Sequence, residues 1–239
     1  MEAPSIAILV PVLARPLSAA PLVASIRQST TVQHSITFLC SPEDQKEIDA
    51  CKETGARVEI CPFPTGSGNF AKKTNHGFRV TSEPFIFCGA DDLTFTPGWD
   101  FAALDVAEAT GAGVIGTWDG ANPVVMKGQH STHSLVRRSY AEDPGCTVDG
   151  TGAIYCELYD HQLVDNEMCE TAQSRGAWAF ADRSRVLHHH PLYDRRTAMD
   201  PTYEKALKNS KGDRILFMRR RRLWQRELRE QHRAAIRRR

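Results

Sequence analysis

Short apolar runs alternate with amphipathic stretches through the first half of the chain. The apolar runs predict strands over 5–10, 35–40, 57–61, 85–88 and 113–118, and the stretches predict helices over 17–28, 42–55, 69–80 and 99–109. Strand-helix repeats of this kind build a mostly parallel sheet, because a parallel pair needs a crossover connection, which is almost always right-handed. The pattern therefore predicts an α/β fold with a Rossmann-like, mostly parallel sheet flanked by helices.

The second half of the chain breaks this rhythm. A short strand is predicted over 134–138, and the segment 142–153 is rich in Gly, Pro and Asp, which predicts a mobile loop. A helix is predicted over 165–175 with Gly176 as its C-terminal cap. Two short extended pieces, over 178–181 and 185–188, lead to three consecutive histidines.

The C-terminal end of the chain differs in charge from the rest. Ten arginines and two glutamates give residues 219–239 a net charge of +8, which leaves −7 for residues 1–218. From Ile215 onward, one helical face carries Phe217, Trp224, Leu228 and Ala235, with arginines around it. We therefore predict a main domain over 1–195 and a basic helical extension over 196–239. This helix is expected to dock on its own acidic body or to form a homo-oligomer, and the alternatives are an anionic membrane surface or nucleic acid.

The composition is that of an ordinary soluble globular protein. Of 239 residues, 41% are hydrophobic and 25% are charged, and no run of about 18 apolar residues predicts a membrane span. The apolar opening lacks the basic flank and the length of a signal peptide, so we expect a cytoplasmic protein. The seven cysteines include no Cys-x-x-Cys pair, which favours reduced, buried thiols over zinc ligands or a disulfide framework.

Two adjacent carboxylates follow the apolar run Phe85–Cys88. Because ligands of open α/β sheets bind beyond the carboxyl ends of the strands, Asp91 and Asp92 stand where a bound ion or phosphate would be met. Hard oxygen ligands at that place suit Mg²⁺ or Mn²⁺ carrying a substrate diphosphate. The alternative interpretation is that the pair caps the following turn.

Three short motifs, taken in order, resemble those of the inverting family 2 glycosyltransferases, which have the nucleotide-sugar-binding GT-A fold. Asn75-His76-Gly77 precedes the central strand, Ala90-Asp91-Asp92 follows it, and Asp165, Glu167 and Gly176 keep the family's spacing around a later helix. The resemblance covers roughly residues 5–192. Three positions depart from the family pattern: Ala90 at the first acidic position, Pro11-Val12-Leu13-Ala14 after the first strand, and Cys40-Ser41 where an acid often reads the nucleotide base.

The resemblance implies roles on the donor side. Asp92 would ligate Mn²⁺ or Mg²⁺, and His188 or His190, which share one face of an extended segment, would complete the metal site. Asp91 would orient the ribose or the sugar, or support the metal through water. Lys72 or Lys73 could reach a phosphate, although a solvated helix face is the alternative. The residues predicted to bind the nucleotide-sugar donor are Pro11, Arg15, Lys72, Asn75, Asp91 and Asp92.

On the acceptor side, an inverting reaction needs one general base to take the proton of the attacking hydroxyl. The resemblance implies Asp165 for this role, and helix capping is the alternative interpretation. Trp118, His161 and Glu167 are predicted to line the acceptor site, with a structural role as the alternative for His161. The acceptor class stays open and includes a hydroxylated nucleobase of a modified nucleic acid.

The sequence thus predicts a metal-dependent glycosyltransferase that moves a sugar to a hydroxyl acceptor with inversion. Two alternatives remain at this stage. A nucleotidyltransferase would use a similar sheet and cation, but it usually needs a glycine-rich phosphate loop after the first strand, and residues 11–16 contain no glycine. A nucleic-acid-binding module would instead act through the arginine-rich tail.

Overall fold

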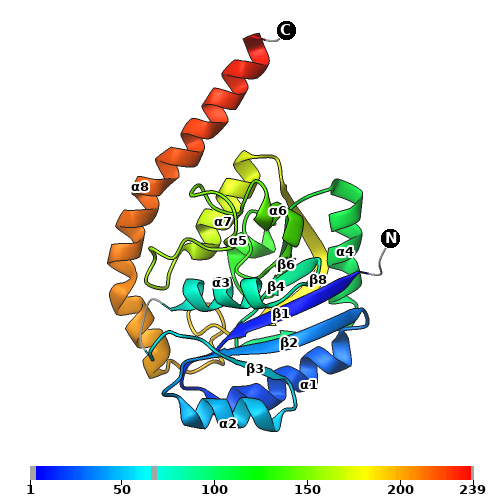
Figure 1. The fold of residues 1–239 in the computed structure, drawn as a ribbon, viewed down its shortest axis with the longest axis vertical. Helices are drawn as coiled ribbons and strands as arrows, with labels where there is room; N and C mark the ends of the chain where they lie inside the picture. The colour runs from blue at the N-terminus through cyan, green and yellow to red at the C-terminus, as the bar shows by residue number, and fades with distance from the viewer. Residues whose placement is uncertain (1–3, 66–68, 238–239) are drawn as a thin grey trace.

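The structure is a computed structural model that describes residues 4–65 and 69–237. One eight-stranded sheet has the order β3-β2-β1-β4-β7-β6-β8-β5 (Figure 1). Its strands are β1 (Ser5–Pro11), β2 (Gln33–Cys40), β3 (Arg57–Ile60), β4 (Phe85–Cys88), β5 (Leu93–Phe95), β6 (Val114–Trp118), β7 (Ser134–Arg137) and β8 (Trp178–His188). Four neighbouring pairs are parallel (β1–β2, β1–β4, β2–β3 and β6–β8), and three are antiparallel (β4–β7, β6–β7 and β5–β8).

Helices cover both faces of the sheet, and α8 runs along one side of the molecule and extends beyond it (Figure 1). The helices are α1 (Ala19–Ser29), α2 (Gln45–Glu53), α3 (Phe70–Val80), α4 (Trp99–Thr110), α5 (Pro123–Met126), α6 (Arg138–Glu142), α7 (Val164–Ser174) and α8 (Pro201–Arg237), with a 3-10 turn η1 (Pro16–Ser18) before α1. Within the described ranges, no helix combines the length and the apolar composition needed to cross a bilayer.

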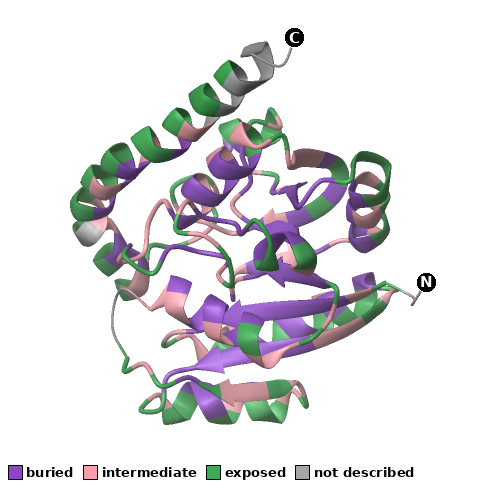
Figure 2. Cartoon of the chain, turned by 45° about the horizontal axis from the view of Figure 1, so that its top comes forward, coloured by how far each residue is buried: buried purple, intermediate pink, exposed green. Residues whose placement is uncertain are grey.

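The alternation of side chains along β1 divides the interior into two cores. Ile6, Ile8 and Val10 face a core that includes residues of α1, α2 and α4, whereas Ala7 and Leu9 face a core that includes residues of α3, α7 and α8. This division follows from the two-residue period of a strand. Because both faces are covered, the central strands are buried along their length, as the apolar runs predict (Figure 2).

Most elements predicted from the sequence are present, and the exceptions have local causes. β5 directly follows the acidic pair and is only three residues long, which is too short for an alternation of apolar and polar residues to predict a strand. The two pieces predicted over 178–181 and 185–188 form one strand, β8, whose pairing with β6 contains a register shift. The segment predicted as a mobile loop is irregular, but it buries Cys146 completely.

The basic extension docks on the body of the protein. Phe217 and Trp224, two members of the predicted apolar stripe, are 7% and 2% exposed and pack in the core formed with α3 and α7. The side chains of Leu228 and Ala235 lie outside the described residues. Because Phe217 and Trp224 are already buried, they are not free to form the homo-oligomer contact that the sequence leaves open.

Candidate active site

A cavity of about 520 Å³ lies at the carboxyl edge of β1 and β4. Its walls come from the end of β1 and the loop after it, the loop after β4, the segment before β7, the start of α7 and the first turn of α8. Nine of the candidate site residues named from the sequence line this cavity: Pro11, Arg15, Lys73, Asp91, Asp92, His161, Asp165, His188 and His190. The topology therefore brings together side chains from both halves of the chain, as expected for the carboxyl ends of strands in an open sheet.

The loop after β4 turns sharply to bring its two carboxylates into the cavity. The amide of Gly89 donates to the carbonyl of Leu9 at 2.9 Å, and a Cβ at this position would lie only 2.9 Å from that oxygen. Glycine is therefore required for the close approach. Asp91 and Asp92 follow with side chains 7% and 14% exposed.

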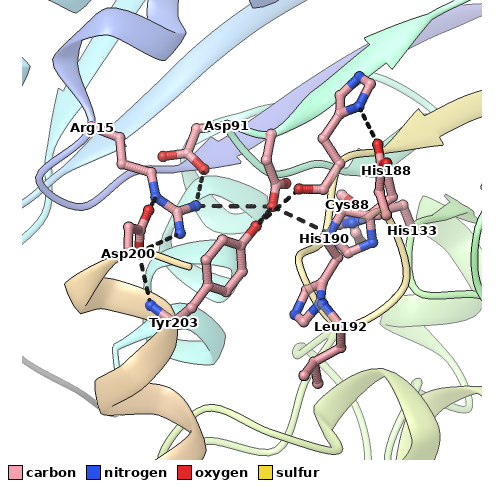
Figure 3. Close-up of polar contacts among 12 residues, drawn as sticks. Arg15, Cys88, Asp91, His133, His188, His190, Leu192, Asp200 and Tyr203 are labelled. Carbon is pink, nitrogen blue, oxygen red and sulfur yellow. Dashed lines mark hydrogen bonds and ion pairs between the residues drawn. The ribbon is translucent and has the colours of Figure 1, made fainter. Parts of the chain in front are cut away.

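The side chains of Asp92 and two histidines offer ligand atoms to one point. The ligand atoms of Asp92, His133 and His188 all lie within 4.8 Å of one another, and His188 Nε2 is 3.3 Å from Asp92 Oδ2. His133 Nδ1 lies 2.9 Å from the carbonyl oxygen of Cys88, which can only accept, so Nδ1 carries the proton and Nε2 keeps a lone pair. The rings of His133 and His188 lie together, with centres 4.7 Å apart (Figure 3). Neither His133 Nε2 nor Asp92 Oδ1 has a hydrogen-bond partner among the described residues, although both are buried. Unpartnered acceptors of this kind fit a bound divalent cation.

The protonation states of these groups also suit a cation site. Burial and the nearby His188 lower the pKa of His133 to about 4, so its ring is neutral at neutral pH. Burial opposes the charge on His188, but Asp92 raises the pKa of His188 overall, and the same ion pair keeps the pKa of Asp92 low despite its burial. A cation would take the place of the proton on His188, because a metal ligates the neutral imidazole. Burial lowers the pKa of His190 to about 4, and its ring lies 5.2 Å from that of His188, outside the three-residue cluster.

The first turn of α8 closes the cavity from the C-terminal side. Arg15 forms an ion pair with Asp91 at 3.0 Å and two hydrogen bonds with Asp200 at 2.8 and 3.1 Å, and its guanidinium lies 4.1 Å from the ring centre of Tyr203. The Tyr203 hydroxyl donates a hydrogen bond to Asp92 Oδ2. Sequence reasoning missed Asp200 and Tyr203, because both lie more than a hundred residues beyond the acidic pair. Arg15 is thus a basic group of the cavity held beside Asp91 and Asp92.

A second ionisable pair stands at the start of α7. Asp165 Oδ2 is 3.1 Å from His130 Nε2, and Asp165 Oδ1 accepts from the amide of Asn166 at 2.9 Å. Burial disfavours the charge on both groups, but their interaction raises the pKa of His130 to about 11 and lowers that of Asp165. Asp165 is thus held ionised in a fixed orientation. The backbone amide that it binds at the start of α7 is that of the next residue, Asn166. No motif in the sequence signals His130.

Two residues assigned to the donor side do not line the cavity. Asn75 is fully buried, and its amide holds the segment after 153: Oδ1 accepts from the amides of Ile154 and Tyr155 at 2.9 and 3.0 Å, and Nδ2 donates to the carbonyl of Tyr155. Lys72 is half-buried on α3 outside the cavity, whereas its neighbour Lys73 lines the cavity and donates to the carbonyl of Val12 at 2.7 Å. Asn75 is therefore a packing residue here.

Two residues assigned to the acceptor side are likewise used elsewhere. Glu167 is 0% exposed and accepts two hydrogen bonds of 2.7 Å from Arg220 and one of 2.8 Å from Tyr159, so it anchors α8. Trp118 lies outside the cavity, under the guanidinium of Arg185 at 5.1 Å. His161 does line the cavity, and its ring packs 5.7 Å from that of Phe70.

The comparisons with known proteins rest on structure. No protein-family model and no curated protein matches the chain. Glucosyl-3-phosphoglycerate synthase from Mycobacterium tuberculosis, solved with Mn²⁺, uridine diphosphate and phosphoglyceric acid, is 13% identical with a TM-score of 0.60, over 90% of this chain and 78% of the other. TarS residues 1–349 from S. aureus are 11% identical with a TM-score of 0.54, over 77% of this chain and 60% of the other. The chain has the GT-A fold that these structures share with it, as its sequence motifs predict.

Proposed function

We propose that this protein is a metal-dependent glycosyltransferase of the inverting, family 2 type. It would move a sugar from a nucleotide-sugar donor to a hydroxyl group of an acceptor. The observation that carries the proposal is the cluster of Asp92, His133 and His188, which holds two buried, unpartnered ligand atoms at the carboxyl edge of a GT-A sheet. The M. tuberculosis synthase, which has the same fold, was solved with Mn²⁺ and a uridine nucleotide.

The donor set favours Mn²⁺ over Mg²⁺. Two imidazoles and one carboxylate offer a mixed nitrogen and oxygen site, whereas Mg²⁺ prefers oxygen ligands and retains its waters. The bound ion would neutralise the charge that develops on the departing diphosphate. Arg15, which lines the same cavity, would add a positive charge on that side.

Asp165 would act as the general base. Its carboxylate is ionised at neutral pH, because the interaction with His130 lowers its pKa, and it lines the same cavity as the proposed metal ligands. An inverting transfer requires one such group to accept the hydroxyl proton as the oxygen attacks the sugar opposite the diphosphate. His130 would act through Asp165 by fixing its orientation and its charge.

The donor can be tested by its effect on stability. We expect one nucleotide sugar from a panel that starts with UDP-glucose to raise the Tm only in the presence of Mn²⁺. A donor at 100 times its Kd would stabilise the protein by about 2.7 kcal/mol, which corresponds to roughly 5–11 °C for a chain of this size. Proton NMR of the product formed with that donor then reports the anomeric configuration. A retained configuration, or stabilisation that does not depend on Mn²⁺, would contradict the proposal.

A further inference from the structure

Helix α8 has two faces with different surroundings. The inner face is buried against the body, whereas the outer face is exposed along the helix (Figure 2). Its inward side chains recur at helical spacing and comprise Tyr203, Ala206, Asp213, Phe217, Arg220 and Trp224. The apolar side of this amphipathic helix is therefore already satisfied within the protein.

Specific polar contacts fix the orientation of the helix. Asp213, only 3% exposed, accepts hydrogen bonds from the backbone amides of residues 160–162 at 2.7 to 2.9 Å. Arg220 binds Glu167 and Asp149, and Arg175 binds Glu227 at 3.2 Å. These contacts hold α8 against rotation about its axis, so the side chains opposite them face solvent.

The outer face carries a line of positive charge, which we call the basic stripe. At 100° per residue, its members lie within about 40° of one line along the helix, and they span roughly 38 Å at 1.5 Å per residue. All seven are exposed, and the one ion pair they form within the described part of the chain is Arg226 with Glu230 at 3.8 Å. The basic stripe consists of Lys208, Lys211, Arg219, Arg222, Arg226, Arg229 and Arg233.

The composition of the stripe favours a soluble polyanion over a membrane surface as its ligand. A helix that lies on a membrane inserts an apolar face, but here that face is buried in the protein, and the exposed large apolar side chains of α8 within the described residues are Ile215, Met218 and Leu223. Along the axis of α8, the basic side chains of the stripe recur every three or four residues, which is about 5 Å. The exception is the interval from Lys211 to Arg219, which contains Ile215. Duplex DNA presents phosphates at similarly close, regular intervals, and arginine pairs with phosphate oxygens through two parallel hydrogen bonds.

We propose that the basic stripe of α8 binds the phosphate backbone of a nucleic acid duplex. The binding surface is separate from the cavity and does not depend on the transfer reaction. Residues 1–218 carry a net charge of −7 even with Lys208 and Lys211 of the stripe included, so the body repels a polyanion and the stripe must supply the attraction. With all seven side chains in contact, the logarithm of the binding constant would fall with the logarithm of salt concentration with a slope of about −6.

The test uses the full chain and a fluorescent DNA duplex of about 20 base pairs, roughly 68 Å long, followed by anisotropy between 50 and 200 mM NaCl. The test variant combines Arg222→Gln, Arg226→Gln and Arg229→Gln. The matched control removes three exposed lysines of the body: Lys46→Gln, Lys52→Gln and Lys127→Gln. We expect the test variant to bind at least about a hundredfold more weakly at 100 mM salt, with a slope smaller by about 3, and the control to bind like the wild type or slightly more weakly, with an unchanged slope.

Three outcomes would overturn the proposal. The first is no binding by the wild type at 50 mM salt, and the second is an equal loss in the test and control variants. The third is binding to phosphatidylglycerol vesicles without binding to the duplex, which would make the stripe a membrane surface. Melting temperatures of both variants show whether each remains folded, and the exposed positions of all six substitutions make folding the expected result.

Discussion

Replacing Arg220 by Met should destabilise the protein strongly, because it would leave the carboxylate of Glu167 buried without its cation. The side chains of Arg220 and Glu167 are 7% and 0% exposed, and two hydrogen bonds of 2.7 Å join them. Removing one partner of a buried ion pair costs about 3–5 kcal/mol. For a chain of this length, that loss corresponds to a fall in Tm of roughly 6–20 °C.

The adjacent arginine provides a matched control. Arg221 pairs with Glu170 at 2.7 Å, but its side chain is 40% exposed, so Arg221→Met should cost no more than about 1 kcal/mol. Adding Glu167→Gln to Arg220→Met should restore most of the loss, since the unpaired charge is gone. Protonation of Glu167 would remove the unpaired buried charge, so the deficit of the single variant should shrink as the pH is lowered. Thermal unfolding that showed Arg220→Met no worse than Arg221→Met would refute this account of Glu167.

The remaining predictions concern the start of α7. Asp165→Asn should reduce transfer by about 10² to 10⁴ with donor affinity unchanged, and full activity would move the base elsewhere. Because the substitution also breaks the ion pair with His130, the Tm should fall, so transfer is compared at a temperature at which the variant is folded. His130→Gln keeps a hydrogen-bond donor beside Asp165 but removes the positive charge that lowers the pKa of Asp165. The pKa of Asp165 should then rise, so the acidic limb of the kcat/KM profile should move to higher pH, and an unmoved limb would rule out this role for His130.

The parts of the fold that the sequence predicts are those with local signals. Phe85–Cys88 is apolar because β4 is buried on both faces, and the two carboxylates follow because the strand ends at the cavity. Asp165 and His161 both line that cavity. Each of these inferences needed only a few consecutive residues and the rule that sites of open sheets lie at the carboxyl edge.

The residues that sequence reasoning missed are brought in by long-range contacts. His133 reaches Asp92 through the antiparallel pairing of β7 with β4, and Tyr203 reaches it through the docking of α8. Neither contact has a local signal. Conversely, Asn75 and Glu167 fit their motifs by spacing, but both side chains are fully buried and hydrogen-bonded within the protein. Spacing along the chain gives the position of a residue, whereas its role also depends on which partners the fold supplies.

Binding of Mn²⁺ tests the central claim most directly. The measurement is electron paramagnetic resonance of free Mn²⁺ during titration of the wild type, of Asp92→Asn and of Asp182→Asn, which changes an exposed carboxylate on β8. The titration is repeated with UDP as the first nucleotide. We expect one Mn²⁺ site in the wild type and in Asp182→Asn, with tighter binding when the nucleotide is present, and loss of that site in a folded Asp92→Asn variant. Unchanged Mn²⁺ binding by Asp92→Asn would contradict the claim that Asp92, with His133 and His188, forms the metal site.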